Sequence, residues 1–260
     1  MLIHPDIDPV ALRLGPLAVH WYGLMYLLGF LGFWWFGVKR ARMPHIRWPE
    51  TRVSDLLFYG VVGVIVGGRL GYTLFYNFSS FVADPLSILR IWEGGMSFHG
   101  GLIGVIVAFI WFARAHQLKA FDVGDFAAPM IPLGLLTGRI GNFINGELWG
   151  SPTTLPWGMV FSHAGPQPRH PSMLYEATLE GLVLFVILWW FAQKPRPRMA
   201  VSGLFLLGYG VFRTMVETVR LPDAHIGYLL GTQWLTMGMV LSAPVWGSGL
   251  VLILLAYRKR

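Results

Sequence analysis

Seven long, mostly apolar stretches divide this chain of 260 residues. They cover residues 17–38, 55–76, 96–113, 123–143, 174–192, 201–219 and 235–257. A membrane's hydrocarbon core of roughly 30 Å needs about 20 apolar helical residues, so each stretch is long enough to cross it. Charged residues make up only 13% of the chain, whereas a soluble domain carries about 25%. The sequence therefore predicts an all-α integral membrane protein in which residues 1–260 form a single domain of seven transmembrane helices.

The positions of the 20 Lys and Arg residues predict the orientation, because basic residues are retained in short cytoplasmic loops. One side of the predicted membrane carries Lys39, Arg40, Arg42, Arg47, Arg52, Arg114, Lys119, Lys194, Arg196, Arg198, Arg258, Lys259 and Arg260. The other side carries only Arg13, Arg90, Arg169 and Arg220. With seven spans, this asymmetry places the N-terminus outside and the C-terminus in the cytoplasm. It also accounts for most of the net charge of +7, so no nucleic-acid partner is expected.

Two segments are expected on the non-cytoplasmic side. Residues 1–16 lack the basic flank and cleavage site of a secretory signal, so the first span is expected to be retained. Residues 146–172 are rich in Gly and Pro and are expected to form a small head. Within the membrane, Pro129 and Pro132 predict a tilt or kink in the fourth span.

The sequence contains no cysteine. This excludes a disulfide framework, a thiolate metal site and any covalent mechanism that uses the protein's own sulfur. His163 and His170 lack the short spacing of a metal-binding pair, so no metal or other cofactor is expected. Glycines spaced four apart predict close helix packing, at Gly63 and Gly67, Gly67 and Gly71, and Gly134 and Gly138.

Three arginines, Arg69, Arg139 and Arg213, lie inside predicted spans and in their outer halves. An Arg within a span costs at least about 2.5 to 3.5 kcal/mol on insertion scales, so each is a functional candidate. Arg69 shares a helix face with Tyr72 and Tyr76, and a snorkelling side chain among interfacial tyrosines is an equally valid interpretation.

Two further groups of polar residues support an anion site. Arg213, Glu217 and Arg220 stand at i, i+4 and i+7 and predict a charge ladder, which purely structural pairing also explains. His99 lies in the glycine-rich residues 94–101, at an outward helix start whose N–H groups attract anions. It is either an interfacial histidine or a proton acceptor beside a bound phosphate.

The densest polar group ends the fourth span, where residues 138–150 read GRIGNFINGELWG. Arg139 offers planar, bidentate donors suited to a phosphodiester, and the group also contains Asn142, Asn145 and Glu147. An ordinary polar helix end is the alternative. Together these features predict an outward-facing, anion-selective cavity reachable from the lipid phase, with a phospholipid headgroup as its ligand. The residues alone leave open an enzyme acting on that headgroup and a phospholipid transporter or scramblase.

The string at 138–150 resembles the signature of bacterial prolipoprotein diacylglyceryl transferases over all its positions. The resemblance extends to HWYGLMY at 20–26, GGRLGY at 67–72, SFHGGL at 97–102, RHPS at 169–172, LYE at 174–176 and residues 202–213. It implies a seven-helix enzyme of the bacterial cytoplasmic (inner) membrane, with its active site toward the periplasm. Such an enzyme transfers the diacylglyceryl group of phosphatidylglycerol to the lipobox Cys of a prolipoprotein. A thioether forms and glycerol 1-phosphate is released, as the first step of lipoprotein maturation.

The resemblance also implies residue roles. Catalytic roles are expected for Tyr22, His99, Arg139 and Arg213, and phosphatidylglycerol binding for Arg69, Arg139, Asn142, Glu147 and Arg213. Supporting roles are expected for Asn145, Gly150, Tyr209, Glu217 and Arg220. Met173 and Met239 stand where the family usually has Gln, which puts in doubt any polar contact made there.

The expected reaction displaces phosphate from an sp3 carbon, and a thiol is a weak nucleophile until it is deprotonated. His99 is expected to take the thiol proton while Arg139 and Arg213 hold the phosphate. The two glutamates, Glu147 and Glu217, are expected to fix these guanidinium groups. Asn142 and Tyr22 are expected to bind the glyceryl oxygens.

Overall fold

The protein is described by a computed structural model that covers residues 2–15, 17–46, 48–90, 92, 94–222 and 227–258. The ends of the N-terminal segment, Met1 and Pro16, and the basic residues Arg47, Lys259 and Arg260 lie outside the described residues. The structure is mostly helical. Its α-helices are α1 (Trp21–Ala41), α2 (Glu50–Phe75), α3 (Phe78–Ala83), α4 (Phe98–Ala115), α5 (Ala120–Ala127), α6 (Ile131–Ile144), α7 (Ser172–Glu176), α8 (Leu184–Phe191), α9 (Ala200–Glu217) and α10 (Met237–Arg258).

Shorter elements connect these helices. A π-helical segment, η4 (Ala177–Val183), joins α7 to α8, and the 3-10 turns are η1 (Pro85–Leu89), η3 (Ser162–Ala164) and η5 (Leu229–Gly231). The strands are β1 (Leu2–Ile3), β2 (Val10–Leu14), β3 (Leu17–His20) and β4 (Met159–Val160). The chain forms two compact units: unit 1 is Met1–Gly37 with Asp125–Arg260, and unit 2 is Val38–Gly124.

In the part of the chain that the structure describes, five continuous helical segments are long and apolar enough to cross a membrane: α1, α2, α4, Ser172–Phe191 and α10. They coincide with five of the seven predicted spans. The predicted sixth span is helical as α9, but its hydropathy is lowered by the charged side chains of Arg213 and Glu217. The predicted fourth span is broken between α5 and α6, so that neither helix is long enough alone. The kink expected at Pro129 and Pro132 is confirmed, because residues 128–130 form a turn and Pro132 lies in the first turn of α6.

The first predicted span begins too early. Residues 17–20 form strand β3, which pairs with β2 in an antiparallel hairpin, and α1 starts only at Trp21. Gly15, with φ +59°, supplies the left-handed turn residue between the two strands. A short, mostly apolar run of four residues fits both a strand and the start of a helix. Pairing with β2 is what makes residues 17–20 a strand.

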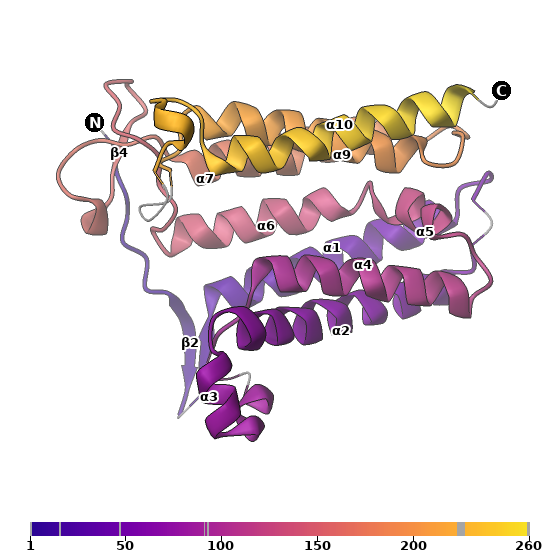
Figure 1. The fold of residues 1–260 in the computed structure, drawn as a ribbon, viewed down its shortest axis with the longest axis horizontal. Coiled ribbons are helices and arrows are strands. Elements are labelled where there is room, and N and C mark those ends of the chain that lie inside the picture. The colour runs from indigo at the N-terminus through magenta and orange to yellow at the C-terminus, as the bar shows by residue number, and fades with distance from the viewer. Residues whose placement is uncertain are drawn as a thin grey trace. The chain divides into compact units, whose positions relative to one another are not determined.

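In unit 1, α9 and α10 lie side by side along most of their length (Figure 1), and α6 packs against η4 and α7. The start of α9 is capped by Asp125, whose carboxylate accepts the backbone N–H groups of Met199 at 2.6 Å and Ser202 at 2.8 Å. The close packing predicted at Gly134 and Gly138 of α6 is not found at these two glycines, because a Cβ on either would meet nothing within 4 Å. The tight position is Gly29 of α1, where a Cβ would lie 3.1 Å from Gly134 Cα.

The N-terminal segment is tied to the 146–172 loop. Strand β1 pairs in parallel with β4, and the buried His4 donates from Nε2 to the carbonyl of Phe143 at 2.7 Å. The His4 ring also stacks on Phe161. Hydrogen bonds from Ser162 and then from His4 lower the pKa of Asp6 from its usual value. Two segments predicted separately thus share one set of contacts at the end of α6.

Unit 2 is built on the pairing of α2 with α4 (Figure 1). Gly63 and Gly67 of α2 meet Gly100 and Gly104 of α4 so closely that a Cβ on any of them would clash with opposing backbone. The close packing predicted from the glycine spacing is confirmed at these two helices.

Candidate functional site

Three guanidinium groups of unit 1 converge on one buried carboxylate, Glu176 at the end of α7. Arg139 from α6 places Nη2 2.6 Å from Glu176 Oε2, and Arg213 from α9 places Nη1 2.8 Å from the same oxygen. Arg220, just after α9, donates to the other oxygen at 3.0 Å. The Glu176 side chain is fully buried, so only a set of strong cationic donors makes an ionised carboxylate tolerable there. The structure therefore brings together three of the arginines that the sequence singled out.

The predicted charge ladder is confirmed. Glu217 accepts from Arg213 Nη2 at 2.5 Å, and Arg220 Nε lies 3.4 Å from the same Glu217 oxygen. The second Glu217 oxygen accepts the hydroxyl of the buried Thr236 at 2.6 Å. Glu217 thus holds both arginines of the ladder, as expected for Arg213.

A hydrogen-bonded chain links the polar residues that end α6. Arg139 donates to the carbonyl oxygen of Asn142 at 3.3 Å, and the Asn142 amide donates to Glu147 at 2.7 Å. Asn145 donates to the same Glu147 oxygen at 3.3 Å. The expectation that Glu147 directly fixes a guanidinium is wrong here, because two carboxamides occupy its oxygen and Arg139 pairs with Glu176 instead. Gly146, with φ +64°, makes the turn that returns Glu147 to Asn142.

Gly150 brings the backbone of the 146–172 loop next to Arg220. It donates its N–H to the carbonyl of His170 at 2.8 Å and forms an isolated bridge with Arg220. A Cβ at this position would lie 2.4 Å from the carbonyl oxygen of Val219. Because Gly150 has no side chain, its backbone can lie close to that of Val219 and Arg220. This close approach sets the position of Arg220, which follows the end of α9. In the same loop, burial lowers the pKa of His170, whose Nδ1 lies 3.2 Å from the hydroxyl of Tyr175.

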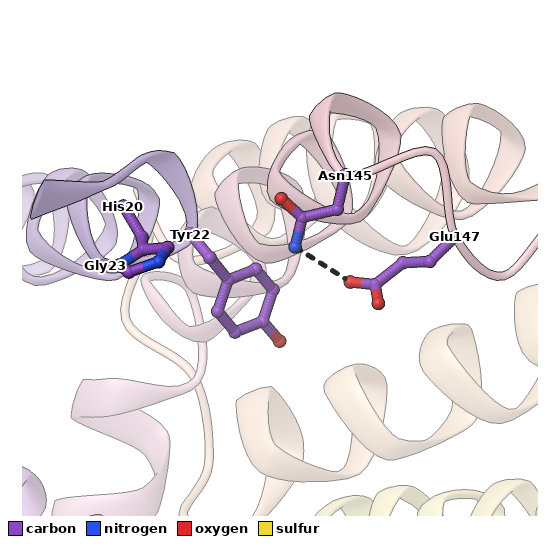
Figure 2. Close-up of a pocket in the computed structure, with 5 residues that line it drawn as sticks. All are labelled: His20, Tyr22, Gly23, Asn145 and Glu147. Atoms are coloured by element: carbon purple, nitrogen blue, oxygen red, sulfur yellow. Dashed lines mark hydrogen bonds between the residues drawn. The ribbon is translucent and has the colours of Figure 1, made fainter. Parts of the chain in front are cut away.

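A cavity of about 570 Å³ opens beside the hydrogen-bonded chain. Figure 2 shows the ring of Tyr22, from the start of α1, next to the hydrogen-bonded side chains of Asn145 and Glu147. His20 and Gly23 complete the lining. Among the described residues, the buried amide oxygen of Asn145 has no hydrogen-bond partner. The cavity is thus lined by four polar side chains, those of His20, Tyr22, Asn145 and Glu147.

In unit 2, the structure uses Arg69 differently from what was expected. Its buried guanidinium donates to backbone carbonyls of the loop before α4, at Ser87, Ile88, Arg90, Gly94 and Gly95. These contacts occupy its donors and correct the prediction that they face a phosphate. The ring of Tyr72 lies beneath the guanidinium at 5.9 Å.

His99 lies exposed in the first turn of α4, with its ring edge-on to Phe98. Ser97 caps the helix and accepts the N–H of Gly100 at 3.2 Å, which satisfies one of the donors expected to attract an anion. His99 and Arg139 belong to different units, and a shared role stays a prediction.

A family model described as prolipoprotein diacylglyceryl transferase matches residues 9–255. This chain belongs to that family. It is 59% identical to a phosphatidylglycerol–prolipoprotein diacylglyceryl transferase of Methylococcus capsulatus, over all of this chain and 99% of the relative. Proteins of the same name from Coxiella burnetii, strain RSA 331 / Henzerling II, and Pseudomonas paraeruginosa are 58% and 55% identical, over all of this chain and 99% and 97% of theirs. The chain is therefore a transferase of lipoprotein biosynthesis.

Sequence reasoning gave no role to two residues of the site, Glu176 and Glu180. Both are fully buried, and Glu180 Oε1 lies 3.8 Å from Arg213 Nη1. A signal was present: two carboxylates at i and i+4 inside an apolar span are as costly as the arginines that were singled out. Of the two departures from the family pattern, Met173 is fully buried. Met239 is half-buried in the first turn of α10.

Proposed function

We propose that this chain transfers the diacylglyceryl group of phosphatidylglycerol to the thiol of the lipobox Cys of a prolipoprotein. The names of its relatives supply the donor and the class of acceptor. The observation that carries the proposal within this chain is the convergence of Arg139, Arg213 and Arg220 on one buried carboxylate. Cations preorganised in a medium of low dielectric can stabilise a leaving phosphate by several kcal/mol.

The reaction breaks the bond between the glyceryl carbon and its phosphate oxygen and forms a carbon–sulfur bond. The thiol loses its proton to His99, His99 then releases that proton to solvent, and the leaving glycerol phosphate takes up one proton from solvent, so protons and charge balance. Arg139 and Arg213 hold the phosphate, and Glu217 keeps Arg213 oriented at 2.5 Å. Asn142 holds Arg139, and the Tyr22 side of the cavity receives the glyceryl hydroxyl groups.

The membrane arrangement belongs to the same proposal. The chain spans the bacterial inner membrane seven times, with α5 and α6 together as the fourth span and α9 as the sixth. The N-terminus and the 146–172 head lie in the periplasm, where a prolipoprotein arrives, and the C-terminus lies in the cytoplasm. The distribution of basic residues supports this orientation.

The deciding experiment incubates the purified protein with phosphatidylglycerol and a lipobox peptide and measures the peptide mass. We expect a thioether-linked diacylglyceryl adduct. Arg139→Ala and Arg213→Ala abolish the adduct while the protein still inserts, whereas Arg13→Ala, at an exposed surface position, leaves it unchanged. A full yield of adduct with Arg139→Ala would overturn the phosphate-binding role. Movement of labelled lipid between leaflets without peptide, and without any adduct, would instead show a transporter.

A further inference from the structure

Glu180 lies at the centre of the charged cluster without the contacts that a buried carboxylate needs. It is in η4, one turn after Glu176, and its side chain is fully buried. Among the described residues, neither of its oxygens has a hydrogen-bond partner. Its nearest cationic atom, Arg213 Nη1, lies 3.8 Å away and is hydrogen-bonded to Glu176 instead. A buried carboxylate without a hydrogen-bond donor holds its negative charge less firmly than one with donors on both oxygens.

Glu176 provides the contrast on the same helical face. It is equally buried, but its two oxygens receive donors from three guanidinium groups at 2.6 to 3.0 Å. Cationic donors therefore reach both oxygens of Glu176 and stabilise a negative charge there. Two carboxyl groups one turn apart therefore have different surroundings, and only Glu180 is placed to change its charge.

The groups that face Glu180 are few. The segment η4 packs against α6, α7, α8 and α9. Among the described residues, these elements and the residues just after α9 bring five titratable or charged groups into electrostatic interaction with it: Arg139, Glu176, Tyr209, Arg213 and Arg220. Helix α8 contributes none, because its sequence, LFVILWWF, is entirely apolar.

The charge of the cluster determines what happens when an anion enters. Three arginines, Arg139, Arg213 and Arg220, stand against three glutamates, Glu176, Glu180 and Glu217, so the fully ionised cluster is neutral. A phosphodiester adds one negative charge. An uncompensated charge in a buried site is expensive, so one carboxylate has to become neutral. Glu176 and Glu217 accept hydrogen bonds on both oxygens, which leaves Glu180.

We propose that Glu180 takes up a proton when the phospholipid binds and releases it when glycerol phosphate leaves. This inference rests on the proposed function. One proton from solvent converts the carboxylate to a carboxylic acid, and no other bond changes. The neutral side chain no longer competes for Arg213, which turns toward the phosphate. Glu180 is a positioning residue that acts through Arg213, and its place in a π-helical segment fits such a role, because these segments recur at functional sites.

The test measures protons and lipid together. The full-length protein in detergent is mixed with short-chain phosphatidylglycerol in weakly buffered solutions from about pH 6 to pH 9, and a pH indicator reports proton uptake. We expect uptake that rises with pH toward about one proton per bound lipid, and a Kd that weakens by up to about tenfold per pH unit on the alkaline side. Glu180→Gln, a neutral side chain of the same shape, retains binding without proton uptake and with a flat pH profile.

Glu176→Gln is the matched control, because it removes the charge one turn away at equal burial. We expect it to weaken phosphatidylglycerol binding at least tenfold, since three guanidinium groups lose their common acceptor. Binding by the unaltered protein without proton uptake would overturn the role of Glu180, and that measurement needs no variant. A loss of binding in Glu180→Gln as large as in Glu176→Gln would overturn it too. A complete lack of phosphatidylglycerol binding by the unaltered protein would instead overturn the proposed function.

Discussion

Asn142 shows how a single neutral side chain connects opposite charges in the site. Its amide oxygen accepts from Arg139, and its amide nitrogen donates to Glu147. The side chain is buried, so water cannot replace either contact. No charged residue can accept from a cation and donate to an anion at the same time, which is why a carboxamide suits this position.

At the residue scale, we predict that Asn142→Asp lowers the rate of diacylglyceryl transfer at least tenfold. The new carboxylate would face Glu147 where the amide donated at 2.7 Å, and like charges in a buried site repel. Adding Glu147→Gln restores a donor opposite the carboxylate and should recover most of the rate. Mass spectrometry of the peptide product measures both. A double variant as inactive as Asn142→Asp alone would contradict this account.

The element that positions Arg220 is a backbone junction rather than a helix. Helix α9 ends at Glu217, and the chain then pairs with Gly150 in an isolated bridge. Ser151 donates its N–H to the carbonyl of Val219 at 2.9 Å, which strengthens the same junction. The 146–172 head thus contributes to the site through the position it imposes on Arg220.

At the element scale, we expect Gly150→Ala to destabilise this junction by about 1 to 3 kcal/mol and to lower transfer activity. The added Cβ would lie 2.4 Å from the Val219 carbonyl, so the bridge to Arg220 has to open. Gly247→Ala is the control, because a Cβ there meets nothing within 4 Å in helix α10. Thermal unfolding and activity are measured for both. Equal effects of the two substitutions would show that the junction is not critical.

At the scale of the whole molecule, the charge asymmetry of the loops predicts the sidedness of the chain. The chain has no cysteine, so a single introduced thiol reports one position without background. We expect Thr154→Cys, exposed in the 146–172 loop, to react with a membrane-impermeant maleimide in intact spheroplasts. Lys194→Cys, exposed between α8 and α9, should react only after the membrane is permeabilised. The reverse pattern would contradict an outward-facing head.

Several features of the site could be predicted from local sequence alone. The string at 138–150 identified Arg139, Asn142 and Glu147 because costly polar residues in an apolar span stand out. The ladder of Arg213, Glu217 and Arg220 followed from helical spacing. The hydrogen-bond partners expected for Arg69 and Glu147 were wrong, because the sequence does not show which acceptors and donors surround a charged group.

The sequence by itself determined that the chain is built of long apolar helices, because hydropathy and length are properties of consecutive residues. Only the tertiary structure decided which charges pair. Glu176 is 37 residues from both Arg139 and Arg213 along the chain, and no local pattern links the three. The packing of α6, α7 and α9 places their guanidinium and carboxylate groups within 3 Å, where low dielectric makes each contact strong. The same packing leaves Glu180 buried, with no hydrogen-bond donor from the residues that the structure describes.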